Sequence, residues 1–300
     1  MISEGEMAAL GAALCWTVSA VLYKKALLNV KPVAVNIVRC TSTSLILLIF
    51  LALASKLEIL AVLTSKALIL ACISGLIGLG LGDTLYLASL KMIGVVKTVP
   101  ITCTYPLFSL LWATLLGGEI ISLQIITGVI IIVLGIWLLG QDKQRKHVEV
   151  ARKILVKGIA LAVLTAITWS ISISMVNMTV KEASNFDHAL AVNTIRVVIT
   201  AVFLLVLAPI GDREFSFLKI RKETFLASSV GGVASLGLGW FFLTYSFAVK
   251  TPESRAVPIS SITPLFSMLS GIIFLHEKVT KQNVLGSMLI VAGIFLVFAN

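Results

Sequence analysis

Long apolar runs separated by short polar segments follow one another along the whole chain. A helix needs about 20 mostly apolar residues to cross the hydrocarbon core of a bilayer. Ten stretches approach this length, and they predict helices at 7–27, 33–53, 67–90, 95–116, 121–139, 158–180, 189–209, 225–249, 256–275 and 284–298. The longest connections, 141–157 and 210–224, are rich in lysine and arginine. The pattern predicts an all-α polytopic membrane protein with no soluble domain between its spans.

Composition and charge narrow the class of protein further. Hydrophobic residues make up 58% of the chain and charged residues 13%, and the mean hydropathy is +1.06. A soluble fold could not hide this much apolar surface, which excludes a soluble enzyme, a nucleic-acid-binding protein and a disordered chain. The net charge of +10 lies mostly in the connecting segments. We therefore expect the lipid bilayer as a partner, and no nucleic acid.

The four cysteines indicate neither a disulfide framework nor a metal site. Cys15, Cys40, Cys72 and Cys103 each fall in an apolar run, and no two of them form a CxxC pair. Such cysteines are typical of small buried hydrophobic side chains. We expect no metal and no cofactor.

The second half of the chain repeats the first. Pro-Leu-Phe-Ser occurs at 106–109 and again at 264–267, 158 residues later. Further matches at nearly the same offset are Leu79–Gly82 with Leu236–Gly239, Asn36 with Asn193, Arg39 with Arg196, Glu119 with Glu277, and Gly128 and Gly135 with Gly286 and Gly293. They indicate a duplication, with repeats at 1–140 and 158–300 joined by a basic linker at 141–157. Each repeat holds five predicted spans, so the second enters the membrane from the opposite side, as in many alternating-access transporters.

The order of these motifs carries a family resemblance. Each half has a Trp in its first predicted helix (Trp16, Trp169), an Arg early in its second, and Pro-x₅-Pro-Leu-Phe-Ser followed by Glu around its fourth. The chain resembles the EamA-type transporters of the drug/metabolite transporter superfamily over nearly its whole length. The resemblance implies ten helices around a central cavity and transport of small metabolites or drugs, and it leaves the substrate open.

Lysine and arginine are unevenly distributed between the two predicted sides of the membrane. Most lie in connections on the side opposite the termini, and every pair of connections agrees in direction. The positive-inside rule places that side in the cytoplasm. We expect a multi-pass protein of the plasma membrane with both termini outside, whereas well-known members of the resembled family have both termini inside.

Ionisable side chains within spans are costly and are candidates for function. Arg39 could extend to the interface or cap carbonyls, or it could attract an anionic substrate group at the cytoplasmic mouth. Arg196 has the same alternatives on the other face. Asp83, whose repeat partner is Trp240, is either a structural carboxylate bonded to Thr or Tyr neighbours or a proton or substrate site. Tyr86, one turn away, could share its proton.

Polar and aromatic side chains form stripes on the predicted helices around the centre. Prolines at 100, 106, 258 and 264 kink the fourth and ninth helices, whose polar stripes suggest a shared wet cavity or hydrogen bonding in a dry bundle. The candidate substrate-binding residues are Trp16, Tyr23, Arg39, Asp83, Tyr86, Thr102, Tyr105, Trp169, Trp240, Tyr245, Ser260 and Thr263.

The fifth and tenth predicted helices carry few polar groups, and their glycines recur every seven residues. This spacing indicates a packing seam, which suits a scaffold or a homodimer contact. Glu119 and Glu277 precede these two helices and should be stabilised by the helix dipole there.

These features favour a secondary transporter, an exporter or exchanger, that moves small metabolites or amphipathic compounds, with proton coupling through Asp83. A cationic-drug efflux pump is one alternative. The other is an intramembrane lipid- or peptide-processing enzyme, which would need clustered nucleophiles, acids or metal ligands within the bilayer, and no such cluster occurs in the sequence. We therefore expect no enzyme activity and no catalytic residues.

Overall fold

The computed structural model describes residues 2–27, 30–140, 152–181, 185–266 and 281–298. The elements within these ranges are helical: α1 (Glu4–Ala26), α2 (Pro32–Leu53), η1 (Leu57–Leu60), α3 (Ser65–Ser74), η2 (Gly75–Gly82), α4 (Asp83–Ile93), α5 (Val95–Thr102), α6 (Tyr105–Leu115), α7 (Leu123–Gly140), α8 (Arg152–Val180), α9 (Phe186–Gly211), η3 (Ser216–Leu218), α10 (Lys222–Gly232), η4 (Val233–Gly239), α11 (Trp240–Ala248), α12 (Glu253–Ser260) and α14 (Lys281–Phe298).

Seven helical segments are long and apolar enough to cross a membrane, and two shorter apolar helices lie at Leu123–Leu138 and Val284–Val297. The predicted span 256–275 begins within α12 and continues into residues outside the described ranges. The helical class is therefore confirmed, and the number of ten stays a prediction. α3, η2 and α4 together form one span, as do α10, η4 and α11.

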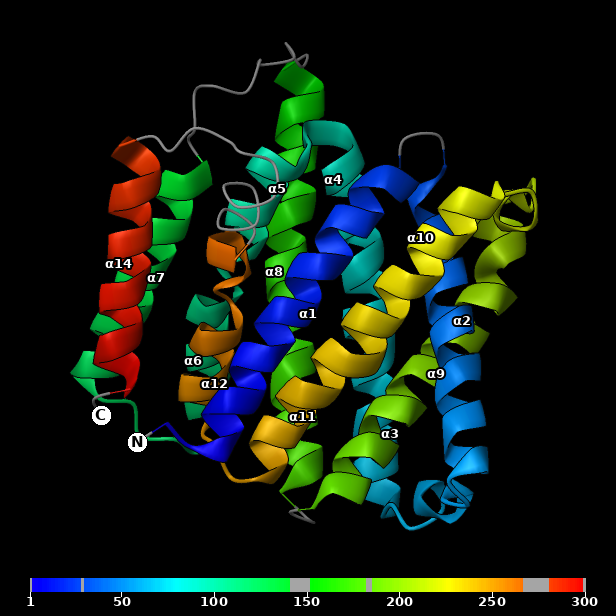
Figure 1. The fold of residues 1–300 in the computed structure, drawn as a ribbon, viewed down its shortest axis with the longest axis horizontal. Coiled ribbons are helices and arrows are strands. Elements are labelled where there is room, and N and C mark those ends of the chain that lie inside the picture. The colour runs from blue at the N-terminus through cyan, green and yellow to red at the C-terminus, as the bar shows by residue number, and fades with distance from the viewer. Residues whose placement is uncertain (1, 28–29, 141–151, 182–184, 267–280, 299–300) are drawn as a thin grey trace.

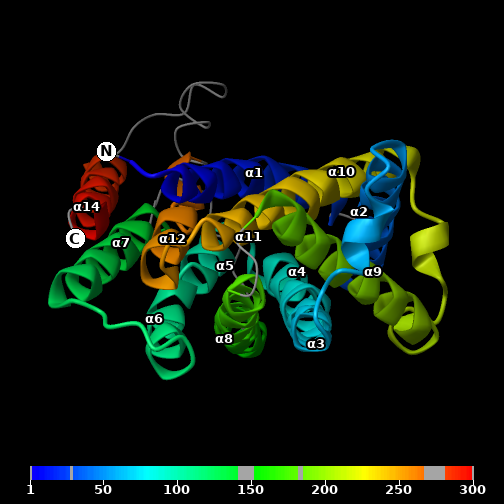
Figure 2. The same cartoon turned by 90° about the horizontal axis from the view of Figure 1, so that it is seen from below.

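The two halves enter the bundle from opposite ends. α1 begins and α14 ends at the same end of the bundle, whereas α8 begins at the other end (Figure 1). α7 and α14 stand together at one end of the long axis, away from α2 and α9 (Figure 2). The chain therefore starts its second half on the opposite side from its first.

The first helix of each half packs against the other half. α1 contacts α10, η4, α11 and α12, all from the second half, and α8 contacts α3, η2, α4, α5 and α6, all from the first. α2 likewise packs against α9. The side chains of α1 and α8 therefore pack against the opposite repeat. For this reason Trp16 lies among second-half residues and Trp169 among first-half residues.

Two glycine-rich π-helical segments interrupt the spans near the centre. In a π-helix the hydrogen bond reaches one residue further than in an α-helix, and such segments often mark functional sites. Asn36 Nδ2 donates to Leu79 O at 3.0 Å in η2, and Asn193 Nδ2 donates to Leu236 O at 2.9 Å in η4. Both asparagines are fully buried. They provide hydrogen bonds to backbone carbonyls that no water reaches.

The recurring glycines of α7 and α14 face one another within the chain. A Cβ on Gly293 would lie 2.6 Å from Gly128 O, and a Cβ on Gly135 would lie 2.7 Å from Gly286 O. The absence of these Cβ atoms lets the two backbones approach closely, as small residues do in membrane helix pairs. The predicted packing seam is therefore an intramolecular scaffold contact, and a homodimer would have to use another surface.

We predict that Gly293→Ala lowers the melting temperature of the purified protein, because its methyl group would push against the Gly128 carbonyl. Overpacking of this kind costs about 1–3 kcal/mol. Gly11→Ala is the matched control, since its Cβ would meet only the Phe242 ring at 3.4 Å or more. An equal fall for both variants would contradict the seam.

Candidate functional site

A buried ion pair lies in the interior of the first half. Arg39 Nη2 donates to Asp83 Oδ2 at 2.7 Å, and both side chains are almost fully buried. Trp169 of α8 donates its Nε1 proton to the other carboxylate oxygen at 2.8 Å. The guanidinium also lies 4.6 Å from the centroid of the Tyr23 ring. The Asp83 carboxylate is thus held by one cation of its own half and one indole of the other half.

The second half contains an equivalent group with one change in chemistry. Arg196, the repeat partner of Arg39, lies 4.1 Å from the centroid of the Trp240 ring, and Trp240 occupies the position equivalent to Asp83. Trp16, the partner of Trp169, packs edge-on against Trp240 at 5.8 Å. Two related triads therefore lie in the bundle: Arg39–Asp83–Trp169 and Arg196–Trp240–Trp16.

Glycines at the end of each π-helix make room for the crossing tryptophans. A Cβ on Gly82 would lie 2.9 Å from Trp169 Cδ1, and a Cβ on Gly239 would lie 2.6 Å from Trp16 Nε1. These contacts are too close for any larger residue unless the indole moves. The last glycine of each Leu-Gly-Leu-Gly segment thus leaves the space in which the tryptophan of the opposite half packs.

Aromatic side chains extend the site from the first triad. Tyr86 and Tyr105 lie 5.2 and 6.1 Å from the Trp169 ring. The Tyr105 hydroxyl hydrogen-bonds with Ser260 Oγ at 3.2 Å, which joins the polar stripes of α6 and α12. Tyr23 makes the corresponding link from α1, through a 2.6 Å hydrogen bond to Ser235 of η4. The described stripes are therefore in direct contact.

Three predicted site residues lie away from this cluster or face their own helix. Thr102 Oγ1 donates to Val99 O within α5, and Thr263 contacts the Ala13 carbonyl of α1. Tyr245 donates to the exposed Glu4 near the start of α1, at the end of the bundle. The structure thus brings together the aromatic and charged candidates but not Tyr245.

The ion pair corrects two expectations from the sequence. Arg39 does not extend to the interface, because its side chain is 3% exposed and bonded to Asp83. Asp83 is not a lone acid bonded to Thr or Tyr neighbours, since its partners are Arg39 and Trp169. Sequence separation hid both contacts, because the pairing depends on how α2 and α8 pack around η2.

Glu119 also differs from its expected role. Its carboxylate accepts hydrogen bonds from the backbone N–H groups of Glu253, at 2.8 Å, and Ser254, at 3.1 Å. It therefore caps α12 of the other half instead of stabilising α7, whose Ile125 N–H is bonded to Ser122 Oγ. Its repeat partner Glu277 lies outside the described residues.

Another buried acid, Glu253, lies at the start of α12, and no sequence pattern predicted it. It is 1% exposed and accepts hydrogen bonds from Ser174 Oγ and from Asn177 Nδ2, the latter at 3.0 Å. Burial raises the pKa of Glu253 to about 7, helped by the nearby Glu119 charge and opposed by the two hydrogen bonds and by Lys181. Repeat comparison could not find Glu253, because it precedes the matched Pro258 in a segment with no acid in the first half.

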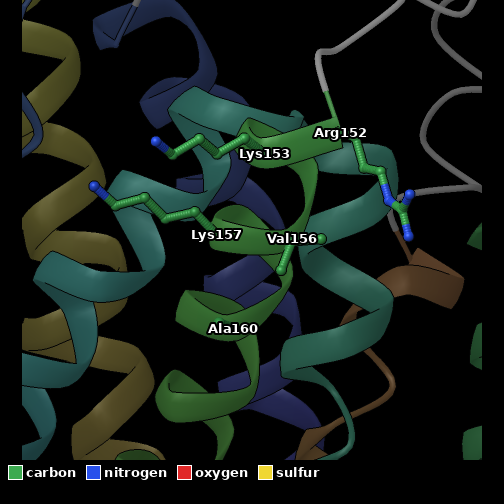
Figure 3. A pocket seen from close by; sticks show the side chains of 5 residues that line it. All are labelled: Arg152, Lys153, Val156, Lys157 and Ala160. Carbon is green, nitrogen blue, oxygen red and sulfur yellow. The ribbon is translucent and has the colours of Figure 1, made fainter.

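A basic hollow marks the surface at the start of α8. Arg152, Lys153, Val156, Lys157 and Ala160 line it, all from one helix. The two lysines point to one side and Arg152 to the other (Figure 3). The hollow therefore offers no convergent set of groups, and it lies at the end of the bundle opposite the termini (Figure 1).

Comparisons with known proteins agree with this architecture. Residues 3–141 and 156–299 each match the family described as the EamA-like transporter family. A protein of Archaeoglobus fulgidus named an uncharacterized transporter is 26% identical over 96% of this chain and 95% of its own length. A Priestia megaterium protein named a probable glucose uptake protein is 28% identical over 73% of this chain and 75% of its own length. One solved crystal structure shares the fold, with a TM-score of 0.78 at 16% identity over 100% of this chain and 98% of that one.

We predict that the stability of the protein falls as pH rises from about 4.5 to about 7, because folded Glu253 binds a proton more tightly than the unfolded chain does. The stabilisation is complete below the unfolded pKa and is lost as pH rises through the folded pKa. Glu253→Gln should flatten this part of the melting-temperature profile, whereas the control Glu58→Gln, at an exposed acid, should not. An unchanged slope in Glu253→Gln would show that Glu253 does not titrate in this range.

Proposed function

Because the chain belongs to the EamA-like transporter family, we propose that it is a secondary transporter that exports or exchanges small metabolites or amphipathic compounds. The chain is a multi-pass membrane protein in contact with the lipid bilayer. The observation that carries the finer proposal is the pair of crossed triads. Each joins an arginine of one half to a tryptophan delivered by the other, so a rearrangement between the halves must alter both.

We propose alternating access between two inverted halves around this cluster. We propose ten spans, with the repeats at 1–140 and 158–300, the linker at 141–157, and the triads between them. The opposite starting ends of α1 and α8 support this arrangement (Figure 1). A structural exchange between the halves would then open the cluster first to one side of the membrane and then to the other.

We propose that the termini lie outside and the linker side lies in the cytoplasm of a plasma membrane. The excess of lysine and arginine on the linker side supports this orientation. The basic hollow at Arg152, Lys153 and Lys157 belongs to the same side.

Within this cycle, Asp83 is the proposed coupling carboxylate. Protonation of Asp83 would remove the charge that Arg39 is paired with, and would thereby free Arg39 and Trp169 to move. A carboxylate within a span that gains and loses a proton is suited to coupling with a proton gradient. Tyr86 lies close to Trp169 and would line the path of the substrate.

We predict that Asp83→Asn abolishes the pH dependence of transport, because the amide keeps the shape but does not titrate. The double variant Asp83→Asn with Arg39→Gln removes the unpaired arginine and controls for misfolding. Trp169→Phe is the matched control, because it removes a hydrogen bond from Asp83 without removing the carboxylate. A folded Asp83→Asn variant with wild-type pH dependence would contradict this role.

Cysteine accessibility tests the central pathway. The native cysteines are first replaced, and a single Cys is then placed at Thr102 or Ser260. The variants are studied in proteoliposomes loaded with labelled amino acids, D-glucose, organic anions or quaternary amines. Each introduced Cys should react with a membrane-impermeant thiol reagent during transport. Ile132→Cys is the control: it is as buried as Thr102 and Ser260, but it lies in the apolar packing between α7 and α14 and not among the polar side chains of α5, α6 and α12. The proposal is overturned if none of these solutes crosses the membrane, or if only the control position reacts.

A further inference from the structure

The Arg196 guanidinium is fully buried and has no acid beside it. Its Nε donates to Ser74 Oγ at 2.9 Å and its Nη2 donates to Ser172 Oγ at 3.1 Å. Its Nη1 has no hydrogen-bond partner among the described residues. Within the same residues, no carboxylate lies within 4.0 Å of any of its nitrogens. Arg196 is therefore a hydrogen-bonded cation without a counter-ion.

Arg39 provides an internal reference for what the fold does with a compensated arginine. At the equivalent position in α2, the guanidinium is bonded to Asp83, and Gly231 stands where Ser74 stands for Arg196. Arg39 thus receives a carboxylate from its own repeat, whereas Arg196 receives two neutral hydroxyl groups, Ser74 from the first repeat and Ser172 from its own. The difference arises at two pairs of equivalent positions, Asp83 with Trp240 and Ser74 with Gly231.

An uncompensated charge inside a bilayer is unfavourable, and a structural role does not require one. The cost of removing a buried cation from water is offset best by a nearby opposite charge with good hydrogen-bond geometry. The Trp240 ring, 4.1 Å from Arg196, offsets part of this cost but carries no net charge. Asp83 exerts some attraction on Arg196, but its two carboxylate oxygens are already bonded to Arg39 and Trp169. While Asp83 is ionised and paired with Arg39, the charge of Arg196 is left unbalanced.

We infer that Arg196 binds the carboxylate of a small organic anion that also carries an aromatic or apolar body. This inference deepens the proposed function and rests on it. One unpaired nitrogen and one unbalanced charge suit a single carboxylate better than a multiply charged phosphate, which needs more donors. The Trp240 ring beside Arg196, with Trp16 packed against it, supplies the apolar surface for the rest of the molecule. A cationic solute would be repelled at the same place.

The first test needs no knowledge of the substrate. In the ligand-free protein, Arg196→Gln removes an uncompensated charge, whereas Arg39→Gln leaves Asp83 unpaired. We expect the melting temperature in nanodiscs to fall for Arg39→Gln and to stay level or rise for Arg196→Gln. A functional residue that is costly to the folded state behaves in this way. An equal fall for both variants would make Arg196 a structural residue and would overturn the inference.

The second test uses phenylacetate and its neutral analogue phenylacetamide as probes. Phenylacetate should raise the wild-type melting temperature more than phenylacetamide does, and its affinity should fall about 10- to 100-fold in Arg196→Gln, as for loss of a hydrogen bond to a charged group. Arg196→Lys keeps the charge and should retain part of the binding, which provides the comparison if Arg196→Gln does not fold. Equal effects of the two probes, or an effect of phenylacetate that survives in Arg196→Gln, would overturn the inference.

Transport separates this inference from the function on which it rests. If proteoliposomes carry organic anions and lose this activity in Arg196→Gln, the transporter assignment and the anion site are both supported. If they carry D-glucose or quaternary amines with kinetics unchanged in Arg196→Gln, the transporter assignment stands and the anion site falls. If no solute of the panel moves, the proposed transport function itself fails, whatever the probes do in the binding assay.

Discussion

Backbone carbonyls within the bilayer must be bonded to protein donors, and the centre of this molecule depends on how two glycine-rich segments meet that requirement. η2 and η4 depart from α-helical bonding where their glycines admit a tryptophan from the opposite half. Asn36 and Asn193 hold the displaced carbonyls by equivalent hydrogen bonds. The widened turns end directly before Asp83 and Trp240. The positions of both triads follow from this arrangement.

The chemistry of the site arises where the two repeats differ around their equivalent arginines, above all at Asp83 and Trp240. The two halves share their asparagine, arginine, tryptophan and glycine positions, so a duplicated chain could have been neutral or equally charged on both sides. The exchange of an acid for an indole, Asp83 for Trp240, pairs Arg39 with a carboxylate and leaves Arg196 beside an uncharged ring. Because the scaffold is symmetric, the two halves can exchange conformations. Because the site is asymmetric, the ligand contacts only the groups around Arg196.

The sequence predicted what depends on local pattern. Apolar run length predicted the helical class and the membrane-length helices that the described residues contain. The repeat register predicted which residues are equivalent, including the arginines and the glycines of α7 and α14. It could not predict contacts that depend on how distant helices cross. The bond between Arg39 and Asp83, the cap that Glu119 provides for α12, and the burial of Glu253 against α8 all join segments whose spacing carries no periodic signal. Tyr245 was predicted as a site residue because it is aromatic, but it lies near the end of α11 and bonds to the exposed Glu4.

The packing of α1 and α8 against the opposite halves has a consequence for biosynthesis. When α1 leaves the ribosome, the helices against which it packs have not been made, and its bond from Trp16 to Ser235 must wait for 219 further residues. Neither half can bury its own first helix, so the early membrane intermediate exposes Trp16 and the unsatisfied face of α1 to lipid. Contacts of such long range slow folding and leave partly assembled chains open to mispairing. Assembly of the native bundle is therefore a late, nearly all-at-once event, and a chain stopped after α9 would lack the surface that retains its first helix.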